Sequence, residues 1–568
     1  MLQDPCQWAP DLVRQAAAKE ILERLVTACA RERLVPVEFA EDHLLLGSNF
    51  EVPVERWYSM ERLDLAALPE GFPGDRCDQL FEYFLLELFG SLPESKRRAL
   101  FTEIQSSYLN MALSLEALSE HGCGEVGEGN LADWEGRVWC GHPLHPGARL
   151  RSGVSPEENR EFGPEWQARL QLPLLSIPAS SVHQTGKFCS RLEGLFPSLG
   201  SVREEGRVLI PVHPWQARHD LRPRFQERFE SGELKFVERT IPARPTMSFR
   251  TVILSSESGQ DYHLKLPVAV QTTGATRTVS VASTQNGPRM SEFLHRLMRL
   301  PIFRESRLFD HLHLMEEPAS FYLRSESEDR SRFCAGILRE GPGDVGGDRT
   351  RWVLPVAALL EPRENPLFCR AARYFGLSPE SLFTGYCQRL LPPLAFLCGQ
   401  MGVALEAHPQ NMLVDFRGLP GTSPEIHFWY RDLGGIRMHA GRLKKAIRER
   451  GWDTSLEAPE FWPGSATVTD SERDLASKFV YSLLQNHLGE LSRAISRVST
   501  SEGDLWRAVD GVLSDHQKLL GQDLEARVFA EEWDLKAMWT MRLDSAVTEY
   551  TYQPVKNPLL QFRKAVCL

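Results

Sequence analysis

The stretch EAHPQNMLVDFRGLPGTSPEIHFWYRDLGG, residues 406–435, contains two runs of strand-forming residues joined by a turn. The runs are MLVDF (412–416) and EIHFWYRDL (425–433), and glycine and proline are concentrated between them. β-Branched and aromatic residues bounded by such breakers predict an antiparallel pair of strands. We therefore expect a hairpin here, inside a region that otherwise has a helical pattern from about residue 366 onward.

Polar residues stand at both ends of this hairpin. Glu406, His408 and Asn411 come before the first strand, and Arg431 and Asp432 close the second. The order resembles the arrangement of protein kinases, in which a loop asparagine and a later Asp-x-Gly aspartate hold Mg²⁺ between phosphate oxygens. The alternative is an Asp-Gly turn after a strand, which the E-x-H-x-Q-N motif one hairpin upstream makes less attractive. Neither a P-loop nor a G-x-S-x-G elbow occurs in the sequence.

A second pair of strands is predicted in the middle third, TMSFRTVIL (246–254) and YHLKLPVAV (262–270), joined by a polar turn. With a side-chain period of two, the polar residues of each run share one face of the sheet. They are Thr246, Ser248 and Arg250 on the first run, and His263 and Lys265 on the second. A guanidinium and an ammonium beside hydroxyl groups would make a phosphate-binding surface. A solvated basic strand edge is the alternative.

The segment that follows, QTTGATRTVS (271–280), can turn helical. If it is helical, Thr273 and Arg277 are four residues apart and meet on one face.

His-Pro dipeptides also recur, in GHPLHPGARLRSG (141–153), IPVHPWQ (210–216) and EAHPQN (406–411). Proline favours an extended backbone at the preceding histidine and removes one backbone donor, which suits an imidazole that faces a ligand. A packed turn with a hydrogen-bonded histidine explains each dipeptide equally well.

The composition excludes several classes of protein. The chain has 568 residues and a formal net charge of −11, which disfavours general binding to nucleic acid or to anionic membranes. Its 11 cysteines form no C-x-x-C pair, as is typical of reduced thiols in the cytoplasm. We read no signal peptide, and the longest apolar stretch, residues 390–405, is too short to cross a bilayer and predicts a buried helix.

Apolar residues at three- and four-residue spacing predict helices over most of the first 120 residues, including 11–34 and 78–92. A long helical pattern returns at 471–498. Glycine-rich stretches at 121–130 and 341–348 predict loops, the second between two strands. The length is that of three or four domains.

Six motifs together resemble a known family, the NRPS-independent siderophore synthetases of the IucA/IucC (aerobactin synthetase) type. H-P-x-H-P-x-x-K-x-R-x-G is matched by residues 142–153, with Arg149 at the position of the family lysine. H-P-W-Q, the S-x-R-T strand and the lysine after it, T-x-x-x-R, E-x-H-x-Q-N and R-D follow in the order of the family. The resemblance covers roughly residues 130–560.

The resemblance implies an α+β multidomain fold shaped like a cupped hand. A helical thumb (1–165), β-rich fingers (166–362) and a mostly helical palm (363–568), distantly similar to kinases, would surround the active site. Such proteins are usually homodimers. ATP would lie between fingers and palm.

The resemblance also implies roles for single residues. The implied ATP-binding residues are Ser248, Arg250, Thr251, Lys265, His408, Gln410, Asn411 and Arg149. The implied residues for the carboxylate substrate are Thr273, Arg277, His408 and Lys536. The implied Mg²⁺ ligands are Asp432, Asn411 and Glu406, and the implied catalytic residues are His408, Arg277 and Lys265.

The activity that follows is that of a cytoplasmic ligase in siderophore biosynthesis and iron acquisition. It would adenylate citrate or a related carboxylic acid with ATP and Mg²⁺, and then condense it with an amine, amino-acid or hydroxyl nucleophile, releasing AMP and pyrophosphate. His408 would either orient the carboxylate or move a proton. A kinase-like phosphotransferase that releases ADP and a non-enzymatic iron-siderophore binding protein are the alternatives.

Overall fold

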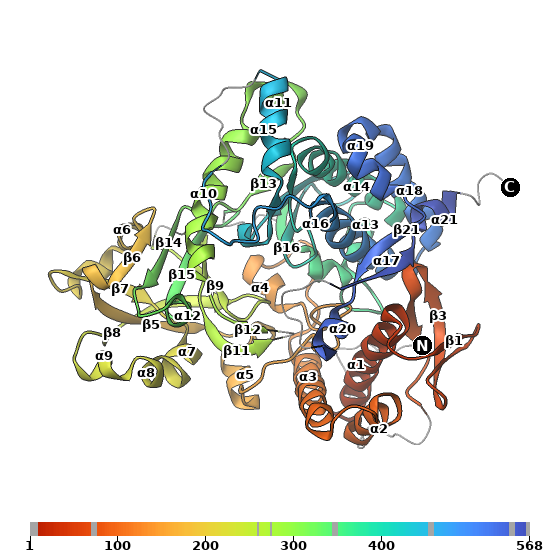
Figure 1. Ribbon diagram of the computed structural model, residues 1–568, viewed down its shortest axis with the longest axis horizontal. Coiled ribbons are helices and arrows are strands. Elements are labelled where there is room, and N and C mark those ends of the chain that lie inside the picture. Colours follow the sequence, from red (N-terminus) through yellow and green to blue (C-terminus); the bar gives the residue numbers. More distant parts are fainter. Residues whose placement is uncertain are drawn as a thin grey trace.

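The computed structural model describes residues 10–69, 77–257, 259, 261–272, 275–343, 350–451, 459–544 and 551–563. Three large clusters of buried apolar side chains organise this mixed α/β chain. Figure 1 shows the N-terminal helices at the lower right, a large sheet at the lower left and the C-terminal helices above. No helix of the described residues combines the length and the apolar character needed to span a bilayer.

The N-terminal part is only partly helical. Its three long helices agree with the predicted pattern: α1 (Pro10–Glu32), α2 (Cys77–Phe89) and α3 (Glu94–His121). Between α1 and α2 lies a four-stranded antiparallel sheet that the helical prediction missed, built from β1 (Val37–Phe39), β2 (His43–Leu46), β3 (Phe50–Tyr58) and β4 (Arg62–Leu65). Phe50, Val52 and Val54 alternate with outward-facing residues, which is a strand period.

The middle of the chain forms an eight-stranded antiparallel sheet in the order β6-β14-β15-β10-β9-β8-β5-β7. Its strands are β5 (Leu170–Pro178), β6 (Val182–Thr185), β7 (Arg207–Pro211), β8 (Lys235–Pro245), β9 (Thr251–Ser255), β10 (Asp261–Lys265), β14 (Ala319–Leu323) and β15 (Ala335–Glu340). The predicted antiparallel neighbours β9 and β10 are confirmed, with Thr251 opposite Lys265. The segment after β10 is not a helix but the hairpin of β11 (Val268–Thr272) and β12 (Ala275–Arg277).

The C-terminal part surrounds a four-stranded sheet, β13-β19-β18-β16, with helices. The strands are β13 (Leu312–Leu314), β16 (Arg351–Pro355), β18 (Met412–Arg417) and β19 (Glu425–Tyr430). The predicted hairpin is therefore confirmed, with Met412 opposite Tyr430. The helices around it include α10 (Val281–Met298), α11 (Pro301–Ser306), α14 (Pro379–Ala395), α17 (Gly489–Ser496), α18 (Glu502–Asp515) and α19 (Gln517–Val528).

The predicted buried helix at residues 390–405 is confirmed as far as Gln400. Helix α14 continues into a π-helical turn, Phe396–Gln400, and the chain then enters the short strand β17 (Val403–Ala404). Gly399 lies so close to the start of α19 that a Cβ atom would be 2.0 Å from the carbonyl oxygen of Leu520. The turn is therefore packed directly against α19.

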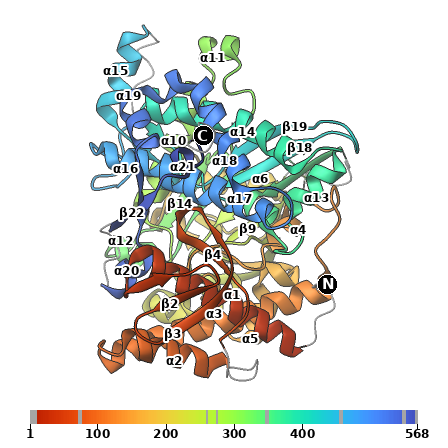
Figure 2. The ribbon, with the colours of Figure 1, turned by 90° about the vertical axis from the view of Figure 1, so that its right-hand side faces the viewer.

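Buried ion pairs connect the N-terminal part to the C-terminal part. Asp64 of β4 pairs with Arg363, Arg493 and Arg497 at 2.8, 2.6 and 2.7 Å. Burial raises the pKa of Asp64, but the three guanidinium groups outweigh burial and hold this pKa far below its usual range. Helix α20 (Met538–Leu543) also lies against α1, and Glu32 of α1 accepts hydrogen bonds from the backbone of α20. Figure 2 shows the two helices in the lower half of the view.

Candidate active site

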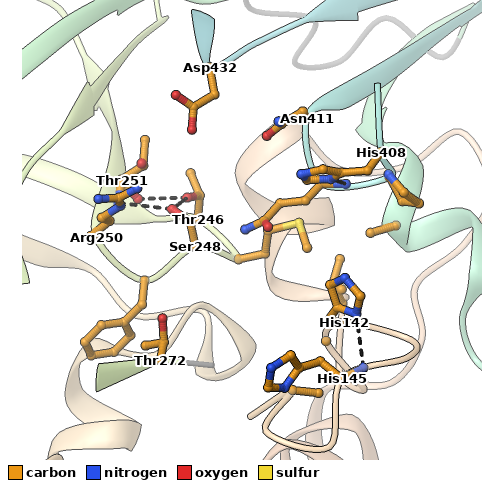
Figure 3. A pocket seen from close by; sticks show the side chains of 18 of the residues that line it. His142, His145, Thr246, Ser248, Arg250, Thr251, Thr272, His408, Asn411 and Asp432 are labelled. Atoms are coloured by element: carbon orange, nitrogen blue, oxygen red, sulfur yellow. Dashed lines mark hydrogen bonds between the residues drawn. The ribbon is translucent and has the colours of Figure 1, made fainter. Parts of the chain in front are cut away.

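A pocket of about 330 Å³ opens where the three parts of the chain meet. Figure 3 shows Asp432 and Asn411 at one end, His142 and His145 at the other, the segment 246–251 on one side and His408 facing it. The pocket thus takes its walls from the loop between α4 (Leu131–Gly136) and α5 (Pro156–Phe162), from the large sheet, and from the ends of hairpin β18–β19. A volume of this size can hold a small organic ligand.

The hydroxyl-rich segment before β9 is a turn, so the predicted continuous strand at 246–250 is wrong. The Thr246 hydroxyl donates to the Thr251 carbonyl at 2.9 Å, and the Ser248 hydroxyl accepts from the Thr251 amide at 3.2 Å. Such local bonds favour turns over strand ladders. Phe249 adopts a left-handed φ of 65° and is buried, which brings Ser248 and Arg250 to the same pocket by a different route.

Lys265 and Asp432 form a direct ion pair in the wall of the pocket. The Lys265 ammonium lies 2.6 Å from Asp432 Oδ1, and the Arg339 guanidinium lies 3.7 Å from the same oxygen. Burial raises the pKa of Asp432, but Lys265, Arg339 and Arg250 outweigh burial and keep this pKa far below its usual range. Asp432 has a φ of 73°, and the backbone turns at Leu433–Gly435 directly after it. The carboxylate is therefore ionised and presented from a turn.

The pocket is strongly cationic, although the whole protein is acidic. Its charged lining residues are Arg149, Arg151, Arg250, Lys265, Arg277, Arg339 and Arg431 against Glu406 and Asp432. Among the described residues, no carboxylate forms an ion pair with Arg250. Burial, reinforced by Arg277, lowers the pKa of Arg250 to about 10, so its guanidinium remains charged at neutral pH. This cluster is suited to an anion that carries several charges.

The His-Pro dipeptides share one local geometry. In each of them Nδ1 of the histidine accepts a hydrogen bond from the backbone N–H two residues later, the first donor after the proline. The four histidines are His142, His145, His213 and His408, with N···N distances between 2.9 and 3.2 Å. Since Nδ1 accepts, the neutral imidazole carries its proton on Nε2. Burial is the main cause that lowers the pKa of all four, which favours this neutral form.

Three of these histidines line the pocket, and one does not. His142, His145 and His408 present their rings to it. His213, from the HPWQ segment, is fully buried and begins helix α7 (Pro214–His219) outside the pocket lining. For His213, the packed-turn interpretation is the correct one.

The oxygen donors at the Asp432 end fit a hard divalent cation that is bound together with phosphates. Asn411 donates through its amide nitrogen to the Glu406 carbonyl at 3.2 Å, which leaves its Oδ1 as an acceptor. Each carboxylate has a lysine partner, Lys478 for Glu406 and Lys265 for Asp432, and both carboxylates are partly exposed in the pocket. Mg²⁺ is typically held by one or two carboxylates and substrate phosphates. No group of three His, Cys, Asp or Glu residues able to hold a metal exists within the described ranges.

Arg149 lines the pocket but is held by the protein. Its Nη1 lies 2.9 Å from Glu165, its Nε donates to the Trp139 carbonyl at 2.5 Å, and Nη2 donates to the Val138 carbonyl. Arg151 shares Glu165 at 2.7 Å. Three of the N–H groups of Arg149 therefore fix the loop that carries His142 and His145.

The remaining predicted site residues are placed as follows. Ser248, Arg250, Thr251, Lys265, Arg277, Glu406, His408, Gln410, Asn411 and Asp432 all line the same pocket. Lys536, the last residue of β21 (Glu532–Lys536), does not line it, but its charge lowers the pKa values of His145 and Glu406. Thr273 lies outside the described residues, and the helical pairing expected for Arg277 is wrong because Arg277 belongs to strand β12.

Sequence reasoning missed two buried glutamates that fix the Asp432 turn from either side. Glu135 of α4 binds Arg431 and accepts from the Met247 amide at 3.1 Å. Glu317 lies 2.7 Å from Arg339, and the Leu433 amide points to the same carboxylate oxygen at 3.4 Å. Glu135 follows Leu131 by four residues, on the apolar face of its helix. A glutamate in such a position is a weak sign of a buried ion pair.

A third missed carboxyl group, Glu361, lies behind the histidine loop. It accepts a hydrogen bond from the Cys140 amide at 2.8 Å, two residues before His142, and it is buried. Burial raises the pKa of Glu361 to about 7. Glu361 is therefore largely protonated in the folded protein below neutral pH.

We expect Glu361→Gln to change how stability depends on pH. The folded state binds this proton more tightly than the unfolded state, so the parent loses stability as the pH rises from about 4.5 to 7. Glutamine keeps an acceptor for Cys140 and cannot ionise. Relative to the parent, the variant should gain up to about 3 kcal/mol between pH 5 and pH 8. Denaturant melts at both values measure this, with Glu364→Gln as the control; a constant difference would contradict the assignment.

Comparison with known proteins finds two family models that match successive segments of the chain. The family model described as "IucA / IucC family" matches residues 130–361, and a model described as "Ferric iron reductase FhuF-like transporter" matches residues 380–551. The first segment contains the histidine loop and the cationic strands, and the second contains hairpin β18–β19. The match to the IucA/IucC family model therefore covers the part of the chain that supplies the histidine loop and the cationic strands of the pocket.

Relatives of this family align with most of the chain. Staphyloferrin A synthase of Staphylococcus aureus is 27% identical over 444 residues, which cover 74% of this chain and 71% of that protein. D-ornithine–citrate ligase of the same organism is 27% identical over 507 residues, covering 79% and 74%. This alignment is longer than either model segment.

A solved IucA/IucC structure has the same fold. The ATP-bound aerobactin synthetase IucA of Klebsiella pneumoniae superimposes with a TM-score of 0.77 at 19% identity, covering 96% of this chain and 99% of that chain. The mixed α/β architecture of this chain is therefore similar to that of aerobactin synthetase IucA.

Proposed function

We propose that this protein is an ATP-dependent carboxylate–amine ligase of siderophore biosynthesis, and that citrate or a close derivative is the acid it activates. The observation that carries the proposal is the cationic pocket in an otherwise acidic protein. Four of its seven basic lining residues pair with buried glutamates outside the lining, and Arg250, Lys265 and Arg277 add positive charge beside the carboxylates of Glu406 and Asp432. Citrate and the triphosphate are both polyanions, and bringing them together requires such a site. Relatives named as citrate ligases support the choice of acid.

The triphosphate would bind along the hydroxyl-rich turn. Ser248, Arg250 and Thr251 face the pocket from one side, and Lys265 lies next to them at the end of β10. Gln410 and Asn411 would contact the nucleotide from the opposite wall. Arg149 would act through the loop that it holds. The anion-binding groups are thereby positioned before the substrate arrives, which lowers the reorganisation needed for reaction.

The Mg²⁺ ligands would be Asp432 and Asn411, with Glu406 beside them. When bound, Mg²⁺ supplies positive charge that offsets the charge of the phosphate oxygens. Asp432 is suited to this role because Lys265 and Arg339 keep it ionised. The ammonium group of Lys265 lies at the same end of the pocket, next to Asp432.

The acid would lie toward the histidine end. Arg277 lines that part of the pocket, and Lys536 is near enough for its charge to act on His145. We assign Thr273 to the same acid from the family motif alone. His408 presents Nε2–H, because its Nδ1 accepts from the Gln410 amide. A donor at this atom can hydrogen-bond a carboxylate oxygen, which supports orientation of the acid over removal of a proton as its role.

Two displacements would complete the reaction. A carboxylate oxygen attacks the α-phosphorus of ATP, the bond to the bridging oxygen breaks, and pyrophosphate leaves with both electrons of that bond. The nitrogen of an amine, or a hydroxyl oxygen, then attacks the acyl carbon; AMP leaves, and the nucleophile loses a proton. Arg250, Lys265 and Arg277 would stabilise the charge that develops on the phosphate and carboxylate oxygens.

The larger organisation follows the same proposal. The thumb (1–165), fingers (166–362) and palm (363–568) would form the three walls of the pocket, and the palm would share a distant kinase-like arrangement through Asn411 and Asp432. The protein would work in the cytoplasm as a homodimer, with no nucleic-acid or membrane partner.

Product analysis tests the proposal. The full-length protein is incubated with ATP, Mg²⁺ and a panel of carboxylic acids, and ATP–pyrophosphate exchange is measured for each acid. An amine and amino-acid panel then follows with the best acid. Exchange that depends on citrate or a derivative, with AMP and pyrophosphate as products, is expected. Release of ADP would favour the phosphotransferase instead, and iron-siderophore binding without nucleotide turnover would favour the binding protein.

We expect Arg277→Ala to lower acid-dependent turnover about 100-fold or more, while the melting temperature changes little. Arg277 lies in the pocket on the short strand β12, and its guanidinium donates to the Thr272 hydroxyl of the neighbouring strand β11. Arg332→Ala, at a nearby position outside the pocket lining, is the control. Normal turnover of every acid by Arg277→Ala would remove this residue from the substrate site.

A further inference from the structure

A second cavity, an open groove, lies in the C-terminal part, outside the active pocket. It has a volume of about 470 Å³ and shares no lining residue with the active pocket. Three segments enclose it: α11 with the chain after it, the C-terminal half of α14, and the start of α19. Its apolar lining consists of Ile302, Phe303, Pro392, Pro393, Phe396 and Leu519, together with Leu308. Figure 1 shows α11 at the top of the view, above α14 and α19, with α2 at the bottom.

The polar lining of this groove is entirely neutral or basic. Arg307, Arg389, His311 and His516 line it, and no aspartate or glutamate of the described ranges does. Arg389 is exposed, and no described residue forms a hydrogen bond or an ion pair with it. Nδ1 of His311 is buried and has no hydrogen-bond partner among the described residues. The groove therefore offers an apolar floor beside a cation that the fold does not neutralise.

We propose that this groove binds a small amphipathic carboxylate, with its apolar body against Phe303, Phe396 and Leu519 and its carboxylate at Arg389. Charge complementarity supports this choice. Asp310 pairs with Arg307 at 2.6 Å, but none of the described carboxylates pairs with Arg389, and no acidic residue lines the groove. An exposed guanidinium that no carboxylate in the described part of the chain engages can form a bidentate pair with such a ligand. The apolar wall supplies the rest of the contact area.

The groove also has a direct structural connection to the active site. Phe396 begins the π-helical turn Phe396–Gln400, and Leu519 precedes the Leu520 carbonyl against which Gly399 packs. The same chain continues through β17 to Glu406 and His408. π-Helical turns are frequent at functional sites. A ligand between Phe396 and Leu519 would therefore lie against the segment that carries His408.

The experiment compares two probes that differ only in charge at one end, 4-phenylbutanoate and 4-phenylbutan-1-ol. Binding to the full-length protein is measured by isothermal titration calorimetry in saturating citrate and α,β-methylene-ATP, which keep the active pocket filled. We expect the carboxylate to bind at least about fivefold more tightly than the alcohol, since the pair with Arg389 is charge-assisted. Arg389→Gln should bring the two affinities within about twofold of each other.

Arg304→Gln is the matched control. Arg304 is an exposed arginine of α11 outside the groove lining, so this variant should keep the fivefold preference. Equal binding of the two probes, no binding of either, or a preference that survives in Arg389→Gln would each overturn the proposal. Carboxylate binding that appears only when citrate and the nucleotide analogue are left out would also overturn it, because the probe would then occupy the active pocket.

Discussion

Asp432→Asn is expected to lower Mg²⁺-dependent adenylation by about 1,000-fold or more while the protein remains folded. Asparagine keeps the size of the side chain and one acceptor oxygen, and it tolerates the left-handed φ of 73° as well as aspartate does. It loses the charge that pairs with Lys265 and that a hard cation requires. If Asp432 only formed the turn, asparagine would replace it with little effect, because both side chains make the same local hydrogen bonds.

Hydroxamate formation with a competent acid, ATP and Mg²⁺ measures this effect, with a thermal melt of the same sample. Asp415→Asn is the control. Asp415 lies on hairpin β18–β19 and pairs with Arg351 at 2.9 Å, but it does not line the pocket. Near-normal activity of Asp432→Asn with an unchanged melt would show that Asp432 is not a metal ligand.

Glu135→Ala is expected to destabilise the protein by about 3 kcal/mol or more and to abolish turnover. The alanine variant leaves the Arg431 guanidinium buried without its carboxylate, and the loss of one partner of a buried ion pair costs about 3–5 kcal/mol. It also removes the acceptor for the Met247 amide, which fixes the turn that carries Ser248 and Arg250. Glu135 does not line the pocket, so it acts as a positioning residue.

A double-mutant cycle separates these two effects. Arg431→Met combined with Glu135→Ala removes both charges, and it should recover part of the stability lost in Glu135→Ala. Activity should not return, because Arg431 also donates to the Gln410 carbonyl at 3.0 Å and Met247 remains without its acceptor. Glu135→Gln should retain more activity than Glu135→Ala, since glutamine can accept from Met247. Strictly additive changes in stability would contradict the coupling between Glu135 and Arg431.

The sequence predicted the parts of the fold that have strong local periodicity. Helices α1, α2 and α3 and hairpin β18–β19 follow from their apolar spacing and their breakers. The sheet β1–β4 was missed because its strands are three to nine residues long and lie between two long helices, where a helical pattern is easily extended. The segment 246–250 was assigned to a strand because its alternation is real, but side-chain bonds to the backbone turn the chain there.

The sequence predicted the site residues that stand in short motifs. It did not predict those whose role depends on tertiary contacts. Ser248, Lys265, His408 and Asp432 stand in short recognisable motifs, and the structure brings them to one pocket. Glu135, Glu317, Arg339 and Glu361 act through partners far away in the sequence; Glu135 and Arg431 are 296 residues apart. No local pattern records such a pairing. The shared role of the His-Pro dipeptides also required coordinates, because it depends on which backbone N–H each ring meets.

The buried ion pairs around Asp64 restrict the order in which the chain can fold during synthesis. Asp64 leaves the ribosome 429 residues before Arg493, which at about 5–20 residues per second is an interval of roughly 20–90 s. Until Arg493 and Arg497 emerge, Asp64 lacks two of its three arginine partners, and an unpaired carboxylate disfavours burial. The native packing of β4 against the C-terminal part therefore cannot be complete before these arginines emerge. We expect nascent chains that end before residue 493 to remain open to proteolysis near β4, and chains that include Arg493 and Arg497 to be protected there.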